Sequence, residues 1–120
     1  MTITYDQQIV RGYFSLGGNE TIVYVTSNAD FLVYIWARNI ETFQGGVQIL
    51  TPPSQFRGTG STGAFDGLVL DVPPQTGMDL GCIGGHAGET MDITSAFGAR
   101  VIVFLTVVTA PGATPKMTRA

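Results

Sequence analysis

Short runs of apolar residues recur along this chain and are separated by Gly, Pro, Asn and Asp. The runs are rich in Val, Ile, Thr and aromatic residues, and the chain contains 16 glycines. Runs this short, bounded by turn signals, are typical of all-β sandwiches and barrels. We therefore predict an all-β fold, an antiparallel β-sandwich of about eight strands with jelly-roll-like or other Greek-key connections. A closed β-barrel is the alternative.

The turn signals divide most of the chain into expected strands, which span residues 8–16, 21–27, 31–38, 47–50, 64–72, 78–83, 89–93 and 100–109. Short turns join the first three, so we expect these to form an antiparallel meander. Residues 92–100 could form one helical turn. The segment 110–120 has no periodicity and contains two prolines. We assign residues 1–109 to a single sandwich domain and residues 110–120 to a flexible C-terminal tail.

Two expected strands, 31–38 and 100–109, are apolar on both faces. One set of alternate positions is purely apolar, and the other is dominated by large side chains: Tyr34, Trp36 and Arg38 in the first strand, and Ile102, Phe104 and Val108 in the second. A strand with one face in water alternates apolar with polar residues. A two-layer sandwich has no third layer to cover the outer side of such strands. We therefore expect these residues to contact other subunits.

Charge is scarce in the sequence. Only 12% of the residues are charged and 44% are hydrophobic, whereas about 25% are charged in ordinary soluble proteins. Either uncharged polar residues coat the surface, or part of it is buried against partners. The net charge of −3 and the scattered basic residues predict no binding to nucleic acid, because phosphates are bound by clustered Lys and Arg.

The start of the chain, MTITYDQQIV, lacks the basic region and apolar stretch of a signal peptide. No apolar run approaches the ~20 residues that span a bilayer. We expect a protein that is made in the cytoplasm and has no membrane partner. The single cysteine cannot form an intrachain disulfide.

The glycine-rich stretch GCIGGHAGET (81–90) contains the single Cys, the single His and a carboxylate: Cys82, His86 and Glu89. One interpretation is a nucleophile, a base and an orienting group. Another is a metal site with Asp79 and Asp92 as further ligands. The spacing fits no familiar zinc pattern, and the chain has no second Cys or His. We expect no catalytic residue, metal or cofactor here.

A turn explains the same stretch better. Period two places Cys82 on one face with Met78 and Leu80, which predicts a buried thiol. Gly84 and Gly85 can supply the positive φ angles of a hairpin turn. The His and Glu side chains then lie at an exposed loop tip or strand edge.

The outward aromatic residues leave several interpretations open. Trp, Tyr and Arg are favoured at protein interfaces, which makes Tyr34, Trp36 and Arg38 candidates for a contact. Packing between the sheets, ordinary core packing and a stacking platform for a ligand are the alternatives for Tyr34 and Trp36.

Two segments outside the strands add candidates. Loop 51–63 is long for a small domain, and its Phe56 and Arg57 either anchor a partner or belong to a mobile Gly/Ser/Thr loop. The tail carries Lys116 and Arg119, two of only six basic residues. It is either a frayed end or an extended arm on a neighbouring subunit.

Together these features predict a non-enzymatic structural protein that acts by association. A small component of a virus or bacteriophage particle, such as a capsid decoration, tail or fibre subunit, has this build. We expect a homo-oligomer, with a trimer favoured, bound to a larger protein assembly. A small carbohydrate- or ligand-binding module that uses Tyr34 and Trp36 is the alternative. A metal-dependent enzyme would need several His and carboxylate ligands, and the chain has one His.

Overall fold

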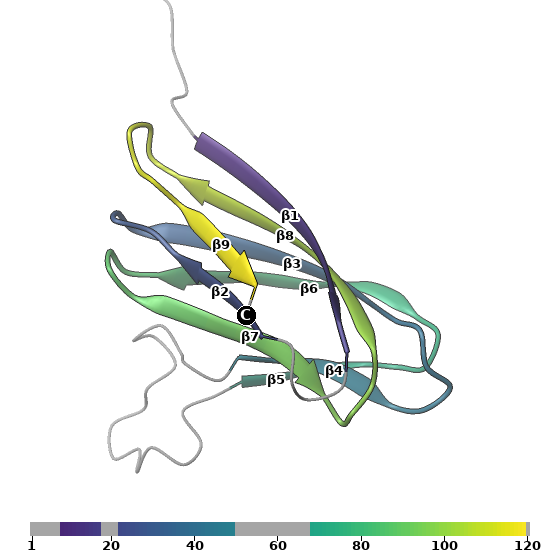
Figure 1. The fold of residues 1–120 in the computed structure, drawn as a ribbon. Helices are drawn as coiled ribbons and strands as arrows, with labels where there is room; N and C mark the ends of the chain where they lie inside the picture. The colour runs from purple at the N-terminus through teal and green to yellow at the C-terminus, as the bar shows by residue number, and fades with distance from the viewer. Residues whose placement is uncertain (1–7, 18–21, 50–67, 120) are drawn as a thin grey trace, which may run out of the picture.

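The computed structural model describes residues 8–17, 22–49 and 68–119. Every regular element in these residues is a β-strand, and the strands form two antiparallel sheets packed as a sandwich (Figure 1). The predicted all-β sandwich is confirmed. The alternative of a closed barrel is wrong, because the two sheets keep separate edges.

The two sheets differ in size. The four-stranded sheet has the order β1-β8-β3-β6, with β1 at Gln8–Leu16, β8 at Val101–Thr109, β3 at Phe31–Asn39 and β6 at Gly77–Gly85. The five-stranded sheet has the order β5-β4-β7-β2-β9, with β5 at Leu68–Val72, β4 at Gly45–Ile49, β7 at Thr90–Ala96, β2 at Ile22–Thr26 and β9 at Lys116–Arg119.

The first eight strands pair in a nested order. β1 pairs with β8, β2 with β7, β3 with β6 and β4 with β5, all antiparallel. This is one long hairpin whose successive strand pairs enter opposite sheets, which is the jelly-roll arrangement. The ninth strand, β9, lies outside the nested set and pairs with β2.

The expected meander of the first three strands is wrong. β1 and β3 both pair with β8 in the four-stranded sheet, whereas β2 belongs to the other sheet. Short polar turns serve equally well to join neighbours in one sheet or to cross between two. The decisive factor is non-local: β8, apolar on both faces, takes the central place between β1 and β3.

The core lies between the sheets and is built from alternate residues. In β3 and β8 every second side chain is buried: Phe31, Val33, Ile35 and Ala37 in β3, and Val101, Val103, Leu105 and Val107 in β8. The five-stranded sheet contributes Val23, Val25, Val47, Ile49, Val72, Met91 and Ile93 from the opposite side.

One buried polar side chain organises an end of the sandwich. Asn39 is fully buried, and its Nδ2 donates to the carbonyl oxygens of Phe43 at 2.8 Å and Val72 at 3.1 Å. Its Oδ1 accepts a hydrogen bond from the backbone N–H of Glu41 at 2.9 Å. The amide therefore joins the end of β3 to the following loop and to the end of β5.

A β-bulge interrupts the pairing of β3 with β6. Ile35 pairs with Gly81, but the next residue, Trp36, pairs with Asp79, so Leu80 is an extra residue in β6. Gly81 has a φ of 94°, a left-handed conformation that glycine adopts without steric cost. The extra residue shifts the alternation of β6 by one, so the side chains that follow the bulge point to the face opposite to the one that an uninterrupted strand would give them.

This bulge overturns the prediction of a buried thiol. Cys82 lies opposite Tyr34 on the outer face of the sheet and is exposed. The predicted role of Gly84 and Gly85 is also wrong, since both lie within β6 and the positive φ of 83° belongs to Gly88. The turn itself is present, at residues 86–89 between β6 and β7.

Strand β7 extends further than expected, to Ala96, so residues 92–100 do not form a helical turn. The chain reverses at Phe97 and Gly98, whose φ angles are 61° and 69°, and Ala99 N–H donates to the carbonyl of Ala96 at 3.3 Å. Phe at such a φ is strained, because bulky residues clash there with their own backbone.

The segment expected to be a flexible tail contains a strand. Residues 116–119 form β9, which is antiparallel to β2 at the edge of the five-stranded sheet (Figure 1). Pro111 and Pro115 lie before the strand, as expected for residues that lack the N–H of a sheet ladder.

Candidate functional site: an aromatic outer face

The outer surface of the four-stranded sheet is largely apolar. Alternate residues of its strands point away from the core and form rows across the sheet. We call this surface the aromatic face, and its main members are Ile9, Arg11, Tyr13, Leu32, Tyr34, Trp36, Arg38, Asp79, Cys82, Ile102, Phe104, Thr106 and Val108. Six of them are large hydrophobic residues that are 37% to 58% exposed: Ile9, Tyr13, Leu32, Tyr34, Trp36 and Phe104.

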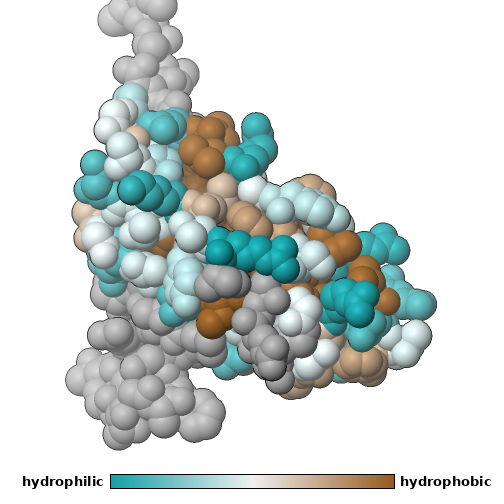
Figure 2. Space-filling view, in the orientation of Figure 1, coloured by the Kyte–Doolittle hydropathy of each residue, from teal (hydrophilic) through white to brown (hydrophobic). Residues whose placement is uncertain are grey.

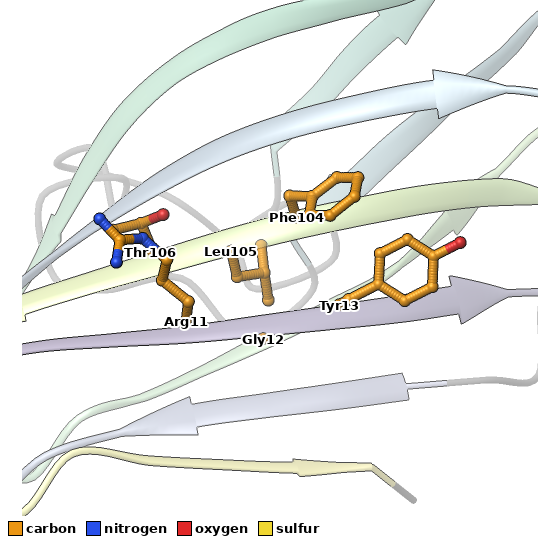
Figure 3. A pocket seen from close by; sticks show the side chains of 6 residues that line it. All are labelled: Arg11, Gly12, Tyr13, Phe104, Leu105 and Thr106. Carbon is orange, nitrogen blue, oxygen red and sulfur yellow. The ribbon is translucent and has the colours of Figure 1, made fainter.

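Three aromatic rings form a row across the middle of the aromatic face. Phe104 of β8 is the register partner of both Tyr13 of β1 and Trp36 of β3. The ring centroids of Tyr13 and Phe104 lie 4.7 Å apart at an interplanar angle of 63° (Figure 3). Those of Trp36 and Phe104 lie 5.4 Å apart at 64°. Both pairs are edge-to-face, a geometry that aromatic rings prefer, so the rings support one another while remaining exposed.

Trp36 is also held against the backbone of β6. The indole lies directly over Gly77: a Cβ at this position would be only 2.6 Å from Cζ2 of the ring. Any other residue at position 77 would displace the ring. An aromatic ring that is already fixed loses little rotational freedom when a partner covers it.

Charge on the aromatic face is sparse and of both signs. Arg11 and Arg38 are exposed, and so is Asp79, the register partner of Trp36 on β6. Oδ1 of Asp79 accepts a hydrogen bond from the N–H of Gly81 at 2.8 Å, which fixes the carboxylate at the bulge. A surface with both signs can meet a copy of itself without a uniform repulsion.

The outer surface of the five-stranded sheet is more polar. Its outward positions include Gln48, Asp71, Asp92 and Thr118, with Val69 as an exposed apolar side chain. In the view of Figure 2, hydrophobic side chains reach the surface in separate patches among hydrophilic and neutral ones. The two sheets therefore present surfaces of different chemistry.

A shallow depression lies on the aromatic face between β1 and β8. It is lined by Arg11, Gly12, Tyr13, Phe104, Leu105 and Thr106, and its volume is ≈ 260 Å³ (Figure 3). Pockets for small molecules usually have volumes of about 300–1,000 Å³ and enclose most of the ligand. The surface therefore suits a broad, shallow contact better than an enclosed ligand.

The predicted contact residues fall into three groups. Those of β3 and β8 share the aromatic face: Tyr34, Trp36, Arg38 and Phe104 are exposed there, and Ile102 and Val108 are partly exposed. Core packing and packing between the sheets are thereby excluded for Tyr34 and Trp36. Lys116 and Arg119 lie on β9 in the other sheet. Phe56 and Arg57 lie outside the described residues.

Sequence reasoning missed the contribution of β1 to the aromatic face. Ile9, Arg11 and Tyr13 point outward, whereas Val10 and Phe14 point inward. The alternation was visible in the sequence, but both faces of this strand carry large hydrophobic residues, so periodicity alone could not assign the outward one.

The stretch GCIGGHAGET is divided between two structural roles. Cys82 belongs to the aromatic face, whereas His86 and Glu89 close the turn between β6 and β7. His86 N–H donates to Oε1 of Glu89 at 2.6 Å, and Glu89 N–H donates to the carbonyl of His86 at 3.0 Å. Nδ1 of His86 lies 3.9 Å from Oδ1 of Asp30.

Two further findings concern the described part of the chain. Within residues 8–17, 22–49 and 68–119, no three His, Cys, Asp or Glu side chains are grouped as metal ligands. The same ranges contain no helix with the length and hydropathy needed to cross a membrane.

Comparisons with known proteins assign no role to any residue of this chain. No protein-family model and no curated protein matches it. One solved structure with a similar arrangement comes from work on Bacillus endospore appendages, which form a family of disulfide-linked pili. The identity is 15%, the match covers 92% of this chain and 96% of that chain, and the TM-score is 0.43.

Proposed function

We propose that this protein is a structural subunit without enzymatic activity that associates with copies of itself through the aromatic face. The observation that supports the proposal most directly is the exposure of six large hydrophobic residues on one face of one sheet. Scattered single apolar residues are normal on a protein surface, whereas a contiguous patch marks a contact.

The size of the patch fits a contact between proteins. With about 150–250 Å² for each large side chain, the exposed fractions of these six residues correspond to roughly 400–700 Å². That reaches the upper end of the range of about 300–600 Å² for the largest apolar patch of a typical monomer. Two copies would together bury roughly 800–1,400 Å² from these residues alone, and a specific interface needs about 1,000 Å².

A second copy of the chain is the partner that this surface suits. It offers an apolar patch of the same size, and its Asp79 can meet Arg11 or Arg38 of the first copy, since both signs occur on one face. The alternative, a carbohydrate-binding module, is less well supported. The ring of Trp36, one of the two residues that such a module would use, stands at 64° to that of Phe104, so these two rings offer no common flat surface for a sugar.

The larger assembly remains a prediction. Jelly rolls occur in viral capsids, lectins and cupins alike, so the fold leaves the biological setting open. The virus or bacteriophage particle and the trimer therefore stay predictions from the sequence, and the aromatic face supports self-association.

Replacing Trp36 with Ala tests the proposal. As a central aromatic residue of the contact, it is expected to contribute ~2 kcal/mol or more, which weakens the dissociation constant by roughly thirtyfold. Sedimentation velocity over a range of protein concentrations measures the change. Val69→Ala is the matched control, because Val69 is 44% exposed but lies on the other sheet, and it should leave association unchanged.

Cys82 provides a second measurement without any substitution. It is the only cysteine of the chain and lies on the aromatic face opposite Tyr34. A maleimide should label it slowly in the assembled protein and quickly in Trp36→Ala. The proposal is wrong if the wild-type chain stays monomeric at ~100 μM, well above the micromolar dissociation constants of the weaker specific interfaces. Rapid labelling of Cys82 within a proven oligomer would place the contact elsewhere. Quenching of Trp36 fluorescence by a soluble glycan, with no effect on assembly, would favour the carbohydrate module.

A further inference from the structure

The C-terminal strand β9 is an addition to a fold that is complete without it. The nested pairs of β1 to β8 account for the whole jelly roll. Among the described strands, β9 pairs with β2 alone. Without β9 the outer edge of β2 would present unpaired N–H and C=O groups, which is a site for another extended segment.

The contacts that hold β9 are few. Four residue pairs align it with β2, from Val23 with Arg119 to Thr26 with Lys116. Met117 is partly buried and packs against the core. Its Sδ lies 2.9 Å from where a Cβ of Gly12 would be, and the ring of Phe14 lies 2.5 Å from the same point. The thioether and this ring therefore share the space that the glycine of β1 leaves, and Met117 anchors β9 against β1 and the core.

The connection from β8 to β9 is a six-residue turn, residues 110–115. Gly112 has a φ of 85°, and the N–H of Ala113 donates to the carbonyl of Ala110 at 3.4 Å. The N–H of Thr114 donates to Oδ1 of Asn28 at 2.8 Å. The folded-back path therefore depends on a left-handed glycine and on two hydrogen bonds. Pro111 and Pro115 stiffen the connection on either side, which favours an extended path once the turn opens.

We propose that β9 is exchanged between two copies of the chain, so that the C-terminal strand of each copy pairs with β2 of the other. Exchange reproduces every contact that β9 makes with β2 and that Met117 makes with the core, so it is opposed by the opening of residues 110–115 and by the freedom that two chains lose when they associate. The exchanged strand lies on the five-stranded sheet, so this link is separate from the aromatic face.

Cysteine pairs across β9 and β2 test the exchange. Tyr24 and Thr118 are register partners on the outer face, at a separation that a disulfide can bridge. Two proteins are prepared in the Cys82→Ser background, one with Tyr24→Cys and one with Thr118→Cys. Mixed at high concentration under mild oxidation, they should form a covalent dimer of twice the chain mass, and neither should do so alone. Contact through the aromatic face cannot produce this product, because both positions lie on the other sheet.

The double variant with Tyr24→Cys and Thr118→Cys is the geometric control, since at low concentration it should form the bridge within one chain. Absence of the mixed covalent dimer, while this control forms its bridge, overturns the proposal. Gly112→Val gives a measurement that does not depend on disulfide geometry. A β-branched residue is strained at this φ and destabilises the closed turn. The equilibrium constant for dimerisation through β9 should therefore rise roughly tenfold. The same comparison is made in the Trp36→Ala background, where the aromatic contact is weakened. A dimerisation constant that Gly112→Val leaves unchanged there also overturns the proposal.

Discussion

Replacing Asn39 with Ala should lower the free energy of unfolding, because it removes a buried amide that makes three hydrogen bonds. The side chain donates two hydrogen bonds and accepts one, and it is fully buried. A net contribution of about 1 kcal/mol for each bond gives roughly 3 kcal/mol for Asn39→Ala. The value would be higher if the carbonyl groups of Phe43 and Val72 stayed buried without a new partner. This is a large part of the ~5–15 kcal/mol by which domains are stable.

Asn39→Asp separates the hydrogen bonds from the packing. The new carboxylate would keep the bond from the N–H of Glu41 but would face the carbonyl oxygens of Phe43 and Val72. Burial and these oxygens would raise the pKa of the introduced carboxyl above that of an unfolded chain. A raised pKa means that the folded state holds the proton more tightly, so stability is highest at low pH and is lost as pH rises through the folded pKa. The difference between Asn39→Asp and Asn39→Ala should therefore depend on pH.

Urea unfolding followed by far-UV circular dichroism, at one protein concentration and at pH 5 and pH 7, measures both effects. We expect Asn39→Asp to be the less stable variant at pH 7 and to recover part of the gap at pH 5. A loss below ~0.5 kcal/mol for Asn39→Ala, the range of ordinary surface substitutions, would refute the reasoning. So would a gap between the two variants that is the same at both pH values.

Three further substitutions test local features, each by the same urea titration. Cys82→Ser should change stability by less than ~0.5 kcal/mol because the thiol is exposed; a loss of ~1–3 kcal/mol would mean that the thiol is buried after all. Phe97→Gly should stabilise the fold by about 1 kcal/mol, since it relieves a non-glycine residue at a φ of 61°; a destabilised variant would show that the ring makes a compensating contact. Thr109→Val should be neutral or stabilising by up to ~1 kcal/mol, because the buried Oγ1 has no hydrogen-bond partner among the described residues, and a clear loss would reveal a partner for the hydroxyl.

Part of the candidate site could be predicted because strand periodicity is local. The alternation in residues 31–38 placed Tyr34, Trp36 and Arg38 on one face, and the structure has them together on the aromatic face. The partners of these residues across the sheet could not be predicted. Tyr13 and Trp36 lie 23 positions apart in the sequence, and only the insertion of β8 between β1 and β3 brings both against Phe104.

The position of Cys82 shows where a periodic pattern fails. Met78, Leu80 and Cys82 follow a perfect alternation, but one extra residue at the bulge reverses the faces. Glycines occupy positions 77, 81, 84 and 85, and each could adopt a positive φ. Which of them does so depends on the pairing of β6 with β3, a contact that no local pattern contains.

The sequence by itself determined that the chain forms strands, where most of them run and which of them are apolar on both sides, because these properties follow from residue type and a period of two. Only the tertiary structure decided the nested order of the strands, the bulge that turns Cys82 outward and the addition of β9 to the edge of β2. Those features depend on contacts between residues far apart in the sequence. Apolar strands of similar composition can make such contacts in many combinations, and the packing of the whole core selects one of them.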